Sequence, residues 1–408
     1  GKITKWKYWD IAQKYKELRL NKIINYEQAK YELKENLIKA IKERFIADVP
    51  IGAFLSGGYD STIVCALAQQ MLNKPIKTFS LGFYSGHVDE AKYAKKVAEY
   101  LNTEHYEIYP EDKDIIRMIT DIPFYFDEPF ADSSEIATML IAEFAKEKVS
   151  VVLSGDGGDE LFGGYNIYTQ LQKAQRFALE GKLLRKIMDI PYIERLDIWN
   201  RMQLYWRIAS DKSNEKNKTQ VGISQYLNLI DKLLLNKSNT YYYEFETKYC
   251  EKRYDITRML LDQETYLQED ILAKVDRASM KYALECRCPI LDKRVIEYSY
   301  RLLPEFKNNK GVQKRILKDL AYEMIPRELL ERPKSGFGVP MQKWLQGPLK
   351  EQLIDWTSRE FLKKQNIFDV DATIEFITSY IRNGDGEKGR GKNYSQICWP
   401  YFIFQQWY

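Results

Sequence analysis

Short apolar segments alternate with helical patterns between residues 49 and 155, and this alternation restricts the fold more than any other feature of the chain. Four segments predict strands because they are short and rich in apolar or β-branched residues: 49–55, 76–83, 105–109 and 149–155. The stretches between them predict helices: 61–72, 88–101 and, as one or two helices, 111–147. Strands that are apolar on both faces and joined by helices form parallel sheets covered on both sides. The sequence therefore predicts an α/β fold with helices on both faces of a parallel sheet.

The character of the sequence changes after Tyr168, where long charged stretches that suit helices replace the alternation. We therefore expect four regions: a linker at 1–24, an α/β core at 25–170, a helical insertion at 171–260 and a mainly helical C-terminal part at 261–408. The linker leads into a predicted helix over residues 26–44. In parallel sheets ligands bind beyond the carboxyl ends of the strands. The turns after Leu55, Phe83 and Leu153 are thus expected to share one edge.

The composition excludes several classes of protein. The 62 Lys and Arg side chains nearly balance 58 Asp and Glu, for a formal charge of +4, which gives no case for a nucleic-acid or membrane partner. Five cysteines in 408 residues do not form a disulfide framework, and two histidines exclude a His-rich metal site. The sequence shows no signal peptide and no run long enough to span a bilayer, so we expect a cytoplasmic protein.

The first strand runs into a glycine-rich turn and then a helix: Ser56-Gly57-Gly58-Tyr59-Asp60-Ser61. Glycines let backbone N–H groups approach an anion closely, and a helix start adds N–H donors and a partial positive charge. The hydroxyls of Ser56 and Ser61 can donate to phosphate oxygens. Asp60 would repel a phosphate unless a cation lay between them, so its presence indicates Mg²⁺. The turn lacks the lysine of a Walker A loop, and the alternative is a helix that Asp60 or Ser61 merely caps.

A second glycine-rich turn follows the strand at 149–155: Ser154-Gly155-Asp156-Gly157-Gly158-Asp159-Glu160. The carboxylates of Asp156, Asp159 and Glu160 are close enough in the sequence to repel one another unless a metal or a cationic side chain is present. Taken alone, this segment also fits a surface turn. Two such turns at neighbouring strand ends indicate a site for phosphate and metal.

Two further segments carry charges whose role the sequence leaves open. Lys314, in GVQKRILKDL (311–320), has other basic residues nearby, a pattern equally typical of a solvated helix face. In ILAKVDRASMKYALECRCPILD (271–292) an apolar helix is predicted to end at Pro289. Its charged residues Asp276, Arg277, Glu285 and Arg287 would have to pair if they were buried. Structural ion pairs explain them as well as substrate binding does.

At these motifs the chain resembles the synthetase half of the glutamine-dependent asparagine synthetases, in the PP-loop ATP pyrophosphatase group. The turn at 56–61 resembles the S-G-G-x-D-S signature of that group, and 154–165 resembles the second acidic loop of the family. The blocks at 274–292 and 332–345 are similar to later segments of the family, and YWD at 8–10 resembles the connector from the glutaminase half. The resemblance runs in order from about residue 8 to residue 345.

The resemblance implies a reaction. ATP adenylates the side-chain carboxylate of aspartate and releases pyrophosphate, and ammonia then attacks the acyl-adenylate to give asparagine and AMP. It also implies ATP and Mg²⁺ as cofactors, with Asp60 and Asp159 as the metal ligands. Asp156 matches the acidic position tied to adenylate formation and ammonia handling, and Lys314 the lysine that neutralises charge on the phosphates and the developing oxyanion.

The residues implied at ATP and pyrophosphate are Leu55, Ser56, Gly57, Gly58, Asp60, Ser61, Leu81, Ser154 and Gly155. The later block offers Asp276, Arg277 and Glu285 as candidates for binding the acid substrate.

The chain departs from the family pattern in three respects. Tyr59 is bulky where a small aliphatic residue is common, and Asp156 is one methylene shorter than the glutamate of some relatives. The glutaminase half, with its N-terminal cysteine nucleophile, has no counterpart in these 408 residues, and Cys65 in the first predicted helix cannot replace it. We therefore expect these residues to use free ammonia, normally supplied by a glutaminase domain or subunit, and not to hydrolyse glutamine themselves.

Other readings stay open at this point. One is a sibling enzyme that adenylates a sugar acid or forms a lactam or lasso-peptide ring. Another is a nucleotide-binding relative without catalysis. A homo-oligomer is possible, and the sequence does not decide it.

Overall fold

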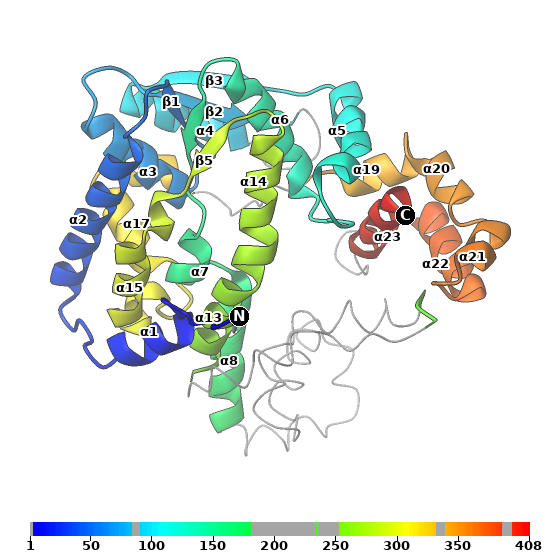
Figure 1. The fold of residues 1–408 in the computed structure, drawn as a ribbon. Helices are drawn as coiled ribbons and strands as arrows, with labels where there is room; N and C mark the ends of the chain where they lie inside the picture. Colours follow the sequence, from blue (N-terminus) through cyan, green and yellow to red (C-terminus); the bar gives the residue numbers. More distant parts are fainter. Residues whose placement is uncertain (1–2, 84–89, 181–232, 236–252, 332–338, 386–393) are drawn as a thin grey trace.

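The centre of the molecule is a parallel β-sheet. The computed structural model describes residues 3–83, 90–180, 233–235, 253–331, 339–385 and 394–408. Within them five strands follow the order β3-β2-β1-β4-β5 (Figure 1). The strands are β1 (Ile51–Phe54), β2 (Lys77–Leu81), β3 (Glu104–Ile108), β4 (Val151–Leu153) and β5 (Glu285–Arg287). Every neighbouring pair is parallel, so the predicted parallel sheet is confirmed and the carboxyl ends of the strands share one edge.

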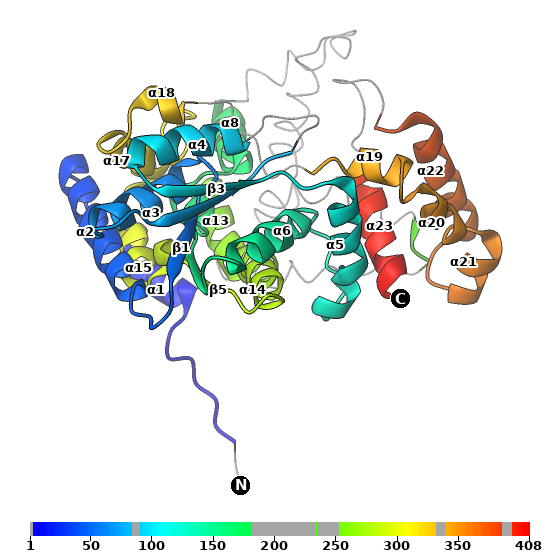
Figure 2. The ribbon, with the colours of Figure 1, turned by 90° about the horizontal axis from the view of Figure 1, so that it is seen from above.

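Helices cover both faces of this sheet (Figure 2). One face carries α2 (Tyr26–Arg44), α3 (Tyr59–Gln70), α4 (Glu90–Leu101) and α17 (Arg315–Tyr322). The other carries α5 (Asp112–Tyr125), α6 (Ser134–Lys146) and α14 (Ala273–Met280). Successive side chains of a strand point to opposite faces. Accordingly Leu153 belongs to the core beneath α3, and Val152 to the core beneath α6.

The helix α2 shows how the sequence sets one of these elements. The side chain of Asn25 caps it by accepting from the backbone N–H of Gln28 at 2.9 Å. Its fully buried positions Leu33, Leu37 and Ile41 recur every four residues, so one face packs on the core while the charged residues stay outside. The predicted helix over residues 26–44 is confirmed.

The rest of the described chain is mainly helical. After the sheet edge come α7 (Gly158–Phe162), α8 (Asn166–Glu180), α13 (Tyr254–Glu264), a π-helical turn (Leu267–Leu272), a 3₁₀ turn (Pro289–Leu291), α15 (Lys293–Arg301), α16 (Pro304–Lys307) and α18 (Arg327–Leu330). The C-terminal group consists of α19 (Met341–Gln346), α20 (Lys350–Asp355), α21 (Arg359–Gln365), α22 (Val370–Asn383) and α23 (Ser395–Trp407), with α23 in contact with α5 (Figures 1 and 2). No described helix has the length and apolar character to cross a membrane.

Two elements differ from the sequence-based expectation. A helix, α1 (Ile11–Leu18), lies in the segment predicted as a linker, and its Ile11 and Ala12 are buried in one apolar cluster with Met259 and Tyr300. The helix predicted up to Pro289 instead ends with α14, and the chain then forms the strand β5. Most of the predicted helical insertion, 171–260, and the first half of the block at 332–345 lie outside the described residues. The division into four regions stays a prediction.

Candidate active site

The first glycine turn connects β1 to α3 and brings two serine hydroxyls together. The Oγ atoms of Ser56 and Ser61 are 3.0 Å apart, and the Ser56 backbone N–H donates to Ser61 Oγ at 3.2 Å. Gly57 has a φ of +71°, a left-handed conformation that favours glycine. Gly58 occupies the N-cap position of α3, so no side chain takes that place. The turn thus presents hydroxyls and a helix start on the same side of the strand end.

The second glycine turn connects β4 to α7, the short helix that carries Asp159 and Glu160. Gly157 and Gly163, on either side of α7, have φ values of +90° and +75°, which again favour glycine. Glu160 is buried at 1% exposure and accepts a hydrogen bond from the Tyr165 hydroxyl. Burial raises the pKa of Glu160 to about 7. Asp159, by contrast, is only partly buried, and its carboxylate pairs with the Lys314 ammonium.

The two turns touch each other so closely that only glycine fits between them. A Cβ atom on Gly155 would lie 2.6 Å from the backbone nitrogen of Ser61. A Cβ atom on Gly158 would lie 2.5 Å from the carboxyl carbon of Asp60. The strands that precede the turns, β1 and β4, are neighbours where the strand order reverses direction. Open parallel sheets bind ligands at this switch point, so the expected shared edge is confirmed for these two turns.

Lys314 joins the two turns from a distant part of the chain. It precedes α17 and adopts a left-handed backbone conformation, with φ of +51°. Its ammonium contacts the Asp60 carboxylate and lies 2.8 Å from Oδ1 of Asp159. Burial by itself lowers the pKa of Lys314, but the charges of Asp60 and Asp159 outweigh burial and raise it above its ordinary value. The cation that accompanies these two carboxylates in this structure is the Lys314 ammonium, and Mg²⁺ at Asp60 and Asp159 stays a prediction.

Asp156 lies close to this group on the same turn as Asp159 and is partly buried, like Asp60 and Asp159. Its Oδ2 accepts from the Ser154 hydroxyl at 2.8 Å. Burial raises the pKa of Asp156, and the hydrogen bond from Ser154 offsets part of that rise. Donor atoms of Asp156, Cys286 and Cys288 all lie within 4.8 Å of one another, which is close enough to share a metal. The Cys286 thiol is a poor ligand, however, because its hydrogen bond to Cys288 and its burial raise its pKa well above the ordinary value.

The other residues implied at the nucleotide occupy neighbouring places on the same edge. Leu55 follows β1 and donates its backbone N–H to the Phe79 carbonyl at 2.9 Å, and Leu81 is the last residue of β2. Ser154 follows β4 and donates its backbone N–H to the Arg287 carbonyl at 2.9 Å. Their backbone is therefore held by the sheet, which fixes the position of any groups that face a ligand.

The three candidates for the acid substrate are not brought together. Asp276 is exposed on α14, and Arg277 on the same helix pairs with the exposed Asp127. Glu285 opens β5 opposite Val151, the first residue of β4, so it lies at the amino end of the sheet, away from the two turns. It pairs there with Arg287 at 2.7 Å.

A group of charged residues that the sequence did not single out lies near Asp156. Lys274, at 7% exposure on α14, donates to Asp132 Oδ2 at 2.5 Å and to the Ser134 hydroxyl at 2.8 Å. Its charge also acts on Asp156. Burial raises the pKa of Asp270 to about 7, and the charge of Asp132 adds to the rise. The only sequence signal was the position of Lys274 two residues before Asp276, inside the later block.

Glu135 belongs to the same group and is its most unusual member. It is fully buried at the start of α6, and neither carboxyl oxygen has a hydrogen-bond partner among the described residues. Burial raises the pKa of Glu135 well above its ordinary value, and the charge of Asp132 adds to the rise. Lys274 therefore faces several carboxyl groups. The positive charge of a bound substrate could balance this excess of acidic groups.

Tyr59, the bulky residue of the first turn, packs its side chain against α17. Its hydroxyl lies 2.9 Å from the Tyr322 hydroxyl, and the Lys318 ammonium lies over its ring, 5.1 Å from the centroid. These residues line an open hollow of about 510 Å³ together with Asp319. The aromatic ring is thus accommodated outside the turn, which explains how this sequence tolerates it.

Comparison with known proteins finds sequence similarity along most of the chain. The family model for asparagine synthase matches residues 32–408. The chain is 28% identical over 389 residues to asparagine synthetase [glutamine-hydrolyzing] 1 of Bacillus subtilis, covering 92% of this chain and 58% of the relative. It is 30% identical over 388 residues to a putative asparagine synthetase [glutamine-hydrolyzing] of Mycobacterium bovis, covering 94% and 58%. A Gibberella zeae protein named amidase chry2 is 20% identical over 422 residues, covering 93% and 62%. The chain thus spans about three fifths of the length of these relatives.

Proposed function

The chain belongs to the asparagine synthase family, and on that premise we propose that it forms an amide from a carboxylic acid and ammonia in an ATP-dependent reaction. In the proposed reaction the side-chain carboxylate of aspartate attacks the α-phosphorus of ATP, giving β-aspartyl-AMP and pyrophosphate. Ammonia then displaces AMP and yields asparagine. A glutaminase domain or subunit would normally supply the ammonia.

The observation that carries this proposal is the meeting of both glycine turns and Lys314 at one edge of the sheet. Expelling pyrophosphate spreads negative charge over phosphate oxygens. Hydroxyls, backbone N–H groups and a buried ammonium that are already in place stabilise such charge without reorganising. Ser56, Ser61 and Lys314 are the groups of this chain that fit the task.

Asp60 and Asp159 fit a magnesium site. Both carboxylates already reach one cation, the Lys314 ammonium, and Gly158 and Gly164 leave the space around them that any side chain would fill. Carboxylate oxygens are the ligands that Mg²⁺ prefers. Bound there with ATP, Mg²⁺ would neutralise charge on the phosphates as a Lewis acid.

Two roles remain: Lys314 would stabilise negative charge on the phosphates, and Asp156 would accept a proton from the new amine. Lys314 is 7% exposed, so its charge acts on the phosphates through a medium of low dielectric and little screening. Ammonia attack on the acyl-adenylate leaves a protonated amine that must lose a proton. Asp156 is assigned to accept it, because a raised pKa brings the carboxyl closer to the working pH.

Recognition of the acid substrate is assigned to Lys274 and the acidic residues around it. Lys274 would pair with a carboxylate of the substrate, and Asp132 or Asp270 with its ammonium. Arg277 and Glu285 are engaged in pairs elsewhere, and Asp276 lies exposed on the same helix as Lys274. An amino acid such as aspartate offers both charges at once.

A sibling reaction is the second candidate. Relatives named amidase chry2 and amidase chyE are 20% and 23% identical over most of this chain, so the similarity extends to proteins with other names. In that case the adenylation stays and the acid changes to a sugar acid, or to an acid that closes a ring.

The experiment that separates these candidates measures pyrophosphate release from ATP and ammonia with a panel of acids. We expect release that depends on aspartate, and its loss in Asp60→Asn. The control is Asp112→Asn, which removes an exposed carboxylate of α5 that pairs with Lys343 on the surface. Release with a uronic acid but not with aspartate would favour the sibling reaction. Absence of release with every acid would contradict the proposed function.

A further inference from the structure

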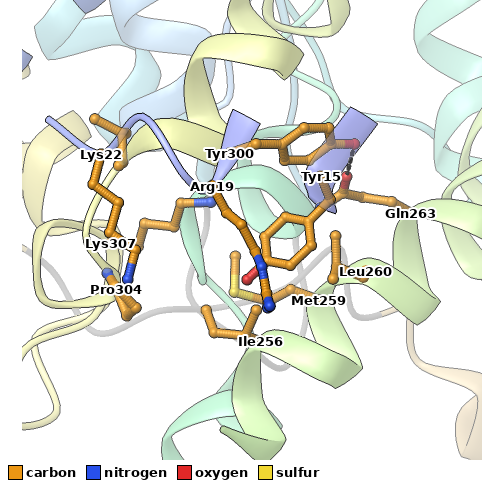
Figure 3. A pocket seen from close by; sticks show the side chains of 11 residues that line it. Tyr15, Arg19, Lys22, Ile256, Met259, Leu260, Gln263, Tyr300, Pro304 and Lys307 are labelled. Carbon is orange, nitrogen blue, oxygen red and sulfur yellow. Dashed lines mark hydrogen bonds between the residues drawn. The ribbon is translucent and has the colours of Figure 1, made fainter. Parts of the chain in front are cut away.

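A small cavity lies between α1, α13 and the segment that joins α15 to α16 (Figure 3). Its volume is about 40 Å³. A single water needs roughly 10–15 Å³ on this measure, so the space holds a group of several atoms. It is far too small for a nucleotide, and none of the residues assigned above to ATP lines it. The cavity is therefore a separate feature of the molecule.

The charged side chains that line this cavity are all positive. Arg19, Lys22 and Lys307 line it, and none of the described residues that form its wall is a carboxylate. In Figure 3 these three residues surround the same space as the rings of Tyr15 and Tyr300. Cationic side chains that converge on an enclosed space create a potential that favours an anion.

Lys307 is the lining residue that an anion would stabilise most, because its ammonium is buried. It is only 6% exposed, and its ammonium makes no hydrogen bond or ion pair within the described parts of the chain. Burial lowers the pKa of Lys307 to about 7, against the opposing charge of Asp255. Asp255 is itself held by Arg253 at 2.8 Å and by Gln172 at 2.6 Å. A buried lysine without a partner is costly, and an anion within reach would remove that cost.

The walls of the cavity are already fixed without a ligand. The Tyr300 hydroxyl donates to Gln263 Oε1 at 2.8 Å, and Gln263 Nε2 donates to the Glu160 carbonyl at 3.1 Å. The rings of Tyr15 and Tyr300 meet edge to face, with centroids 5.7 Å apart. Arg19 lies over the Tyr15 ring, 5.7 Å from its centroid. A site whose walls are in place loses little entropy when it binds.

We propose that this cavity is a binding site for a small inorganic oxyanion of about the size of phosphate, held by Lys307 and Arg19. Lys307 supplies a buried donor from α16, and Arg19 a guanidinium from the end of α1. Both can form charge-assisted hydrogen bonds to oxygen, and the aromatic rings shield these bonds from water. The site does not depend on the proposed reaction.

The test is calorimetric titration of the purified 408-residue protein with inorganic phosphate, at constant ionic strength in chloride. Lys307→Met and Arg19→Gln are each expected to weaken the binding of phosphate roughly 10- to 100-fold, the effect of losing one charge-assisted hydrogen bond. Ser61→Ala is the control, since it changes the first glycine turn and leaves the cavity intact. The Ser61→Ala variant should bind phosphate in the cavity with the same affinity as the unchanged protein.

Three results would overturn the proposal. The first is no phosphate binding in the millimolar range. The second is binding that neither Lys307→Met nor Arg19→Gln weakens. The third is binding that only Ser61→Ala weakens, which would place the phosphate in the glycine turn. Lys307→Met removes a buried charge, so it should fold, and Arg19→Gln changes a partly exposed side chain, so the test does not depend on one variant.

Discussion

At the scale of single residues, the positive charge of Lys314 allows the carboxylates of Asp60 and Asp159 to lie close together at the edge of the sheet. Its ammonium contacts Asp60 and Asp159, which would otherwise repel each other across the two turns. Its backbone is left-handed, a conformation that costs a residue with a Cβ about 1 kcal/mol or more. The backbone direction aims the side chain between the carboxylates. The lysine thus lies where a metal ion and phosphates are proposed to bind.

Lys314→Met is expected to slow aspartate-dependent pyrophosphate release by about 100-fold or more, since losing one group that stabilises developing charge costs about that much. The same variant leaves two partly buried carboxylates without their cation. Breaking such a buried pair costs about 3–5 kcal/mol, so the free energy of unfolding should fall in the absence of Mg²⁺ and recover in part when Mg²⁺ is added. Rates from a pyrophosphate assay and urea unfolding curves measure the two effects.

Lys318→Met is the matched control for this variant. It removes the same charge from α17, one turn further along, where the ammonium lies over the Tyr59 ring. It should leave pyrophosphate release within a few-fold and show no rescue by Mg²⁺. Equal losses in both variants would mean that a general charge effect, and not the contact with Asp60 and Asp159, explains the result.

Glu160 makes stability depend on pH. Its pKa is about 7 in the folded protein against 4.5 for an ordinary glutamate, because it is buried. A carboxyl with a raised pKa keeps its proton in the folded state, so its stabilising contribution is complete below about pH 4.5 and is lost as the pH rises to about 7. The loss amounts to about 3 kcal/mol.

Glu160→Gln removes this titration while keeping an oxygen that can accept from Tyr165. Between pH 5 and pH 8 the unchanged protein should lose up to about 3 kcal/mol of unfolding free energy relative to the variant, measured by urea unfolding at each pH. Comparing the two proteins cancels the other groups that titrate in this range, such as Lys307. A difference that stays constant with pH would show that Glu160 does not titrate there.

At the scale of elements, the sequence predicted the parts whose signals are local. The turn at 56–61 was found because glycine, hydroxyl and carboxylate residues interrupt two apolar runs. The strand β5 was missed because it has only three residues, Glu285–Arg287, and follows a helix without an apolar run of its own. The helix α1 was missed because its buried face depends on Met259 and Tyr300, more than 200 positions away. Pairing and burial of this kind are set by the tertiary structure.

The contact between the two glycine turns can be tested directly. Gly155→Ala would push a methyl group to 2.6 Å from the Ser61 nitrogen, and backbone atoms cannot yield as a flexible side chain does. We expect a loss of about 1–3 kcal/mol in unfolding free energy and a severe loss of pyrophosphate release. The control is Gly58→Ala, whose new Cβ meets only the Ser56 hydroxyl at 3.2 Å.

Melting temperatures followed by circular dichroism, with the pyrophosphate assay, separate these two glycine variants. Gly58→Ala should melt within a few degrees of the unchanged protein. If Gly155→Ala is as stable as Gly58→Ala and as active as the unchanged protein, the two turns do not meet as described.

At the scale of the whole molecule, the site is assembled from segments far apart in the chain. Asp60, Asp159 and Lys314 meet although more than 250 residues separate the first from the last. The two carboxylates could be proposed from their turns. Lys314 could be proposed only through the family resemblance, because its basic helix also fits a solvated surface. Glu135 lies in none of the motifs, and Lys274 lies in the later block without being singled out there, since the importance of both rests on burial and on contacts between α6 and α14.

The central claim is that the acid substrate takes up AMP before ammonia reacts. The most direct test supplies ATP, ammonia and aspartate labelled with ¹⁸O in its carboxylates, and follows the label by mass spectrometry. The account predicts one ¹⁸O atom in the phosphate group of AMP and none in pyrophosphate, because the carboxylate oxygen that attacks the α-phosphorus leaves with AMP. Label in orthophosphate together with ADP, or AMP formed without label, would contradict it.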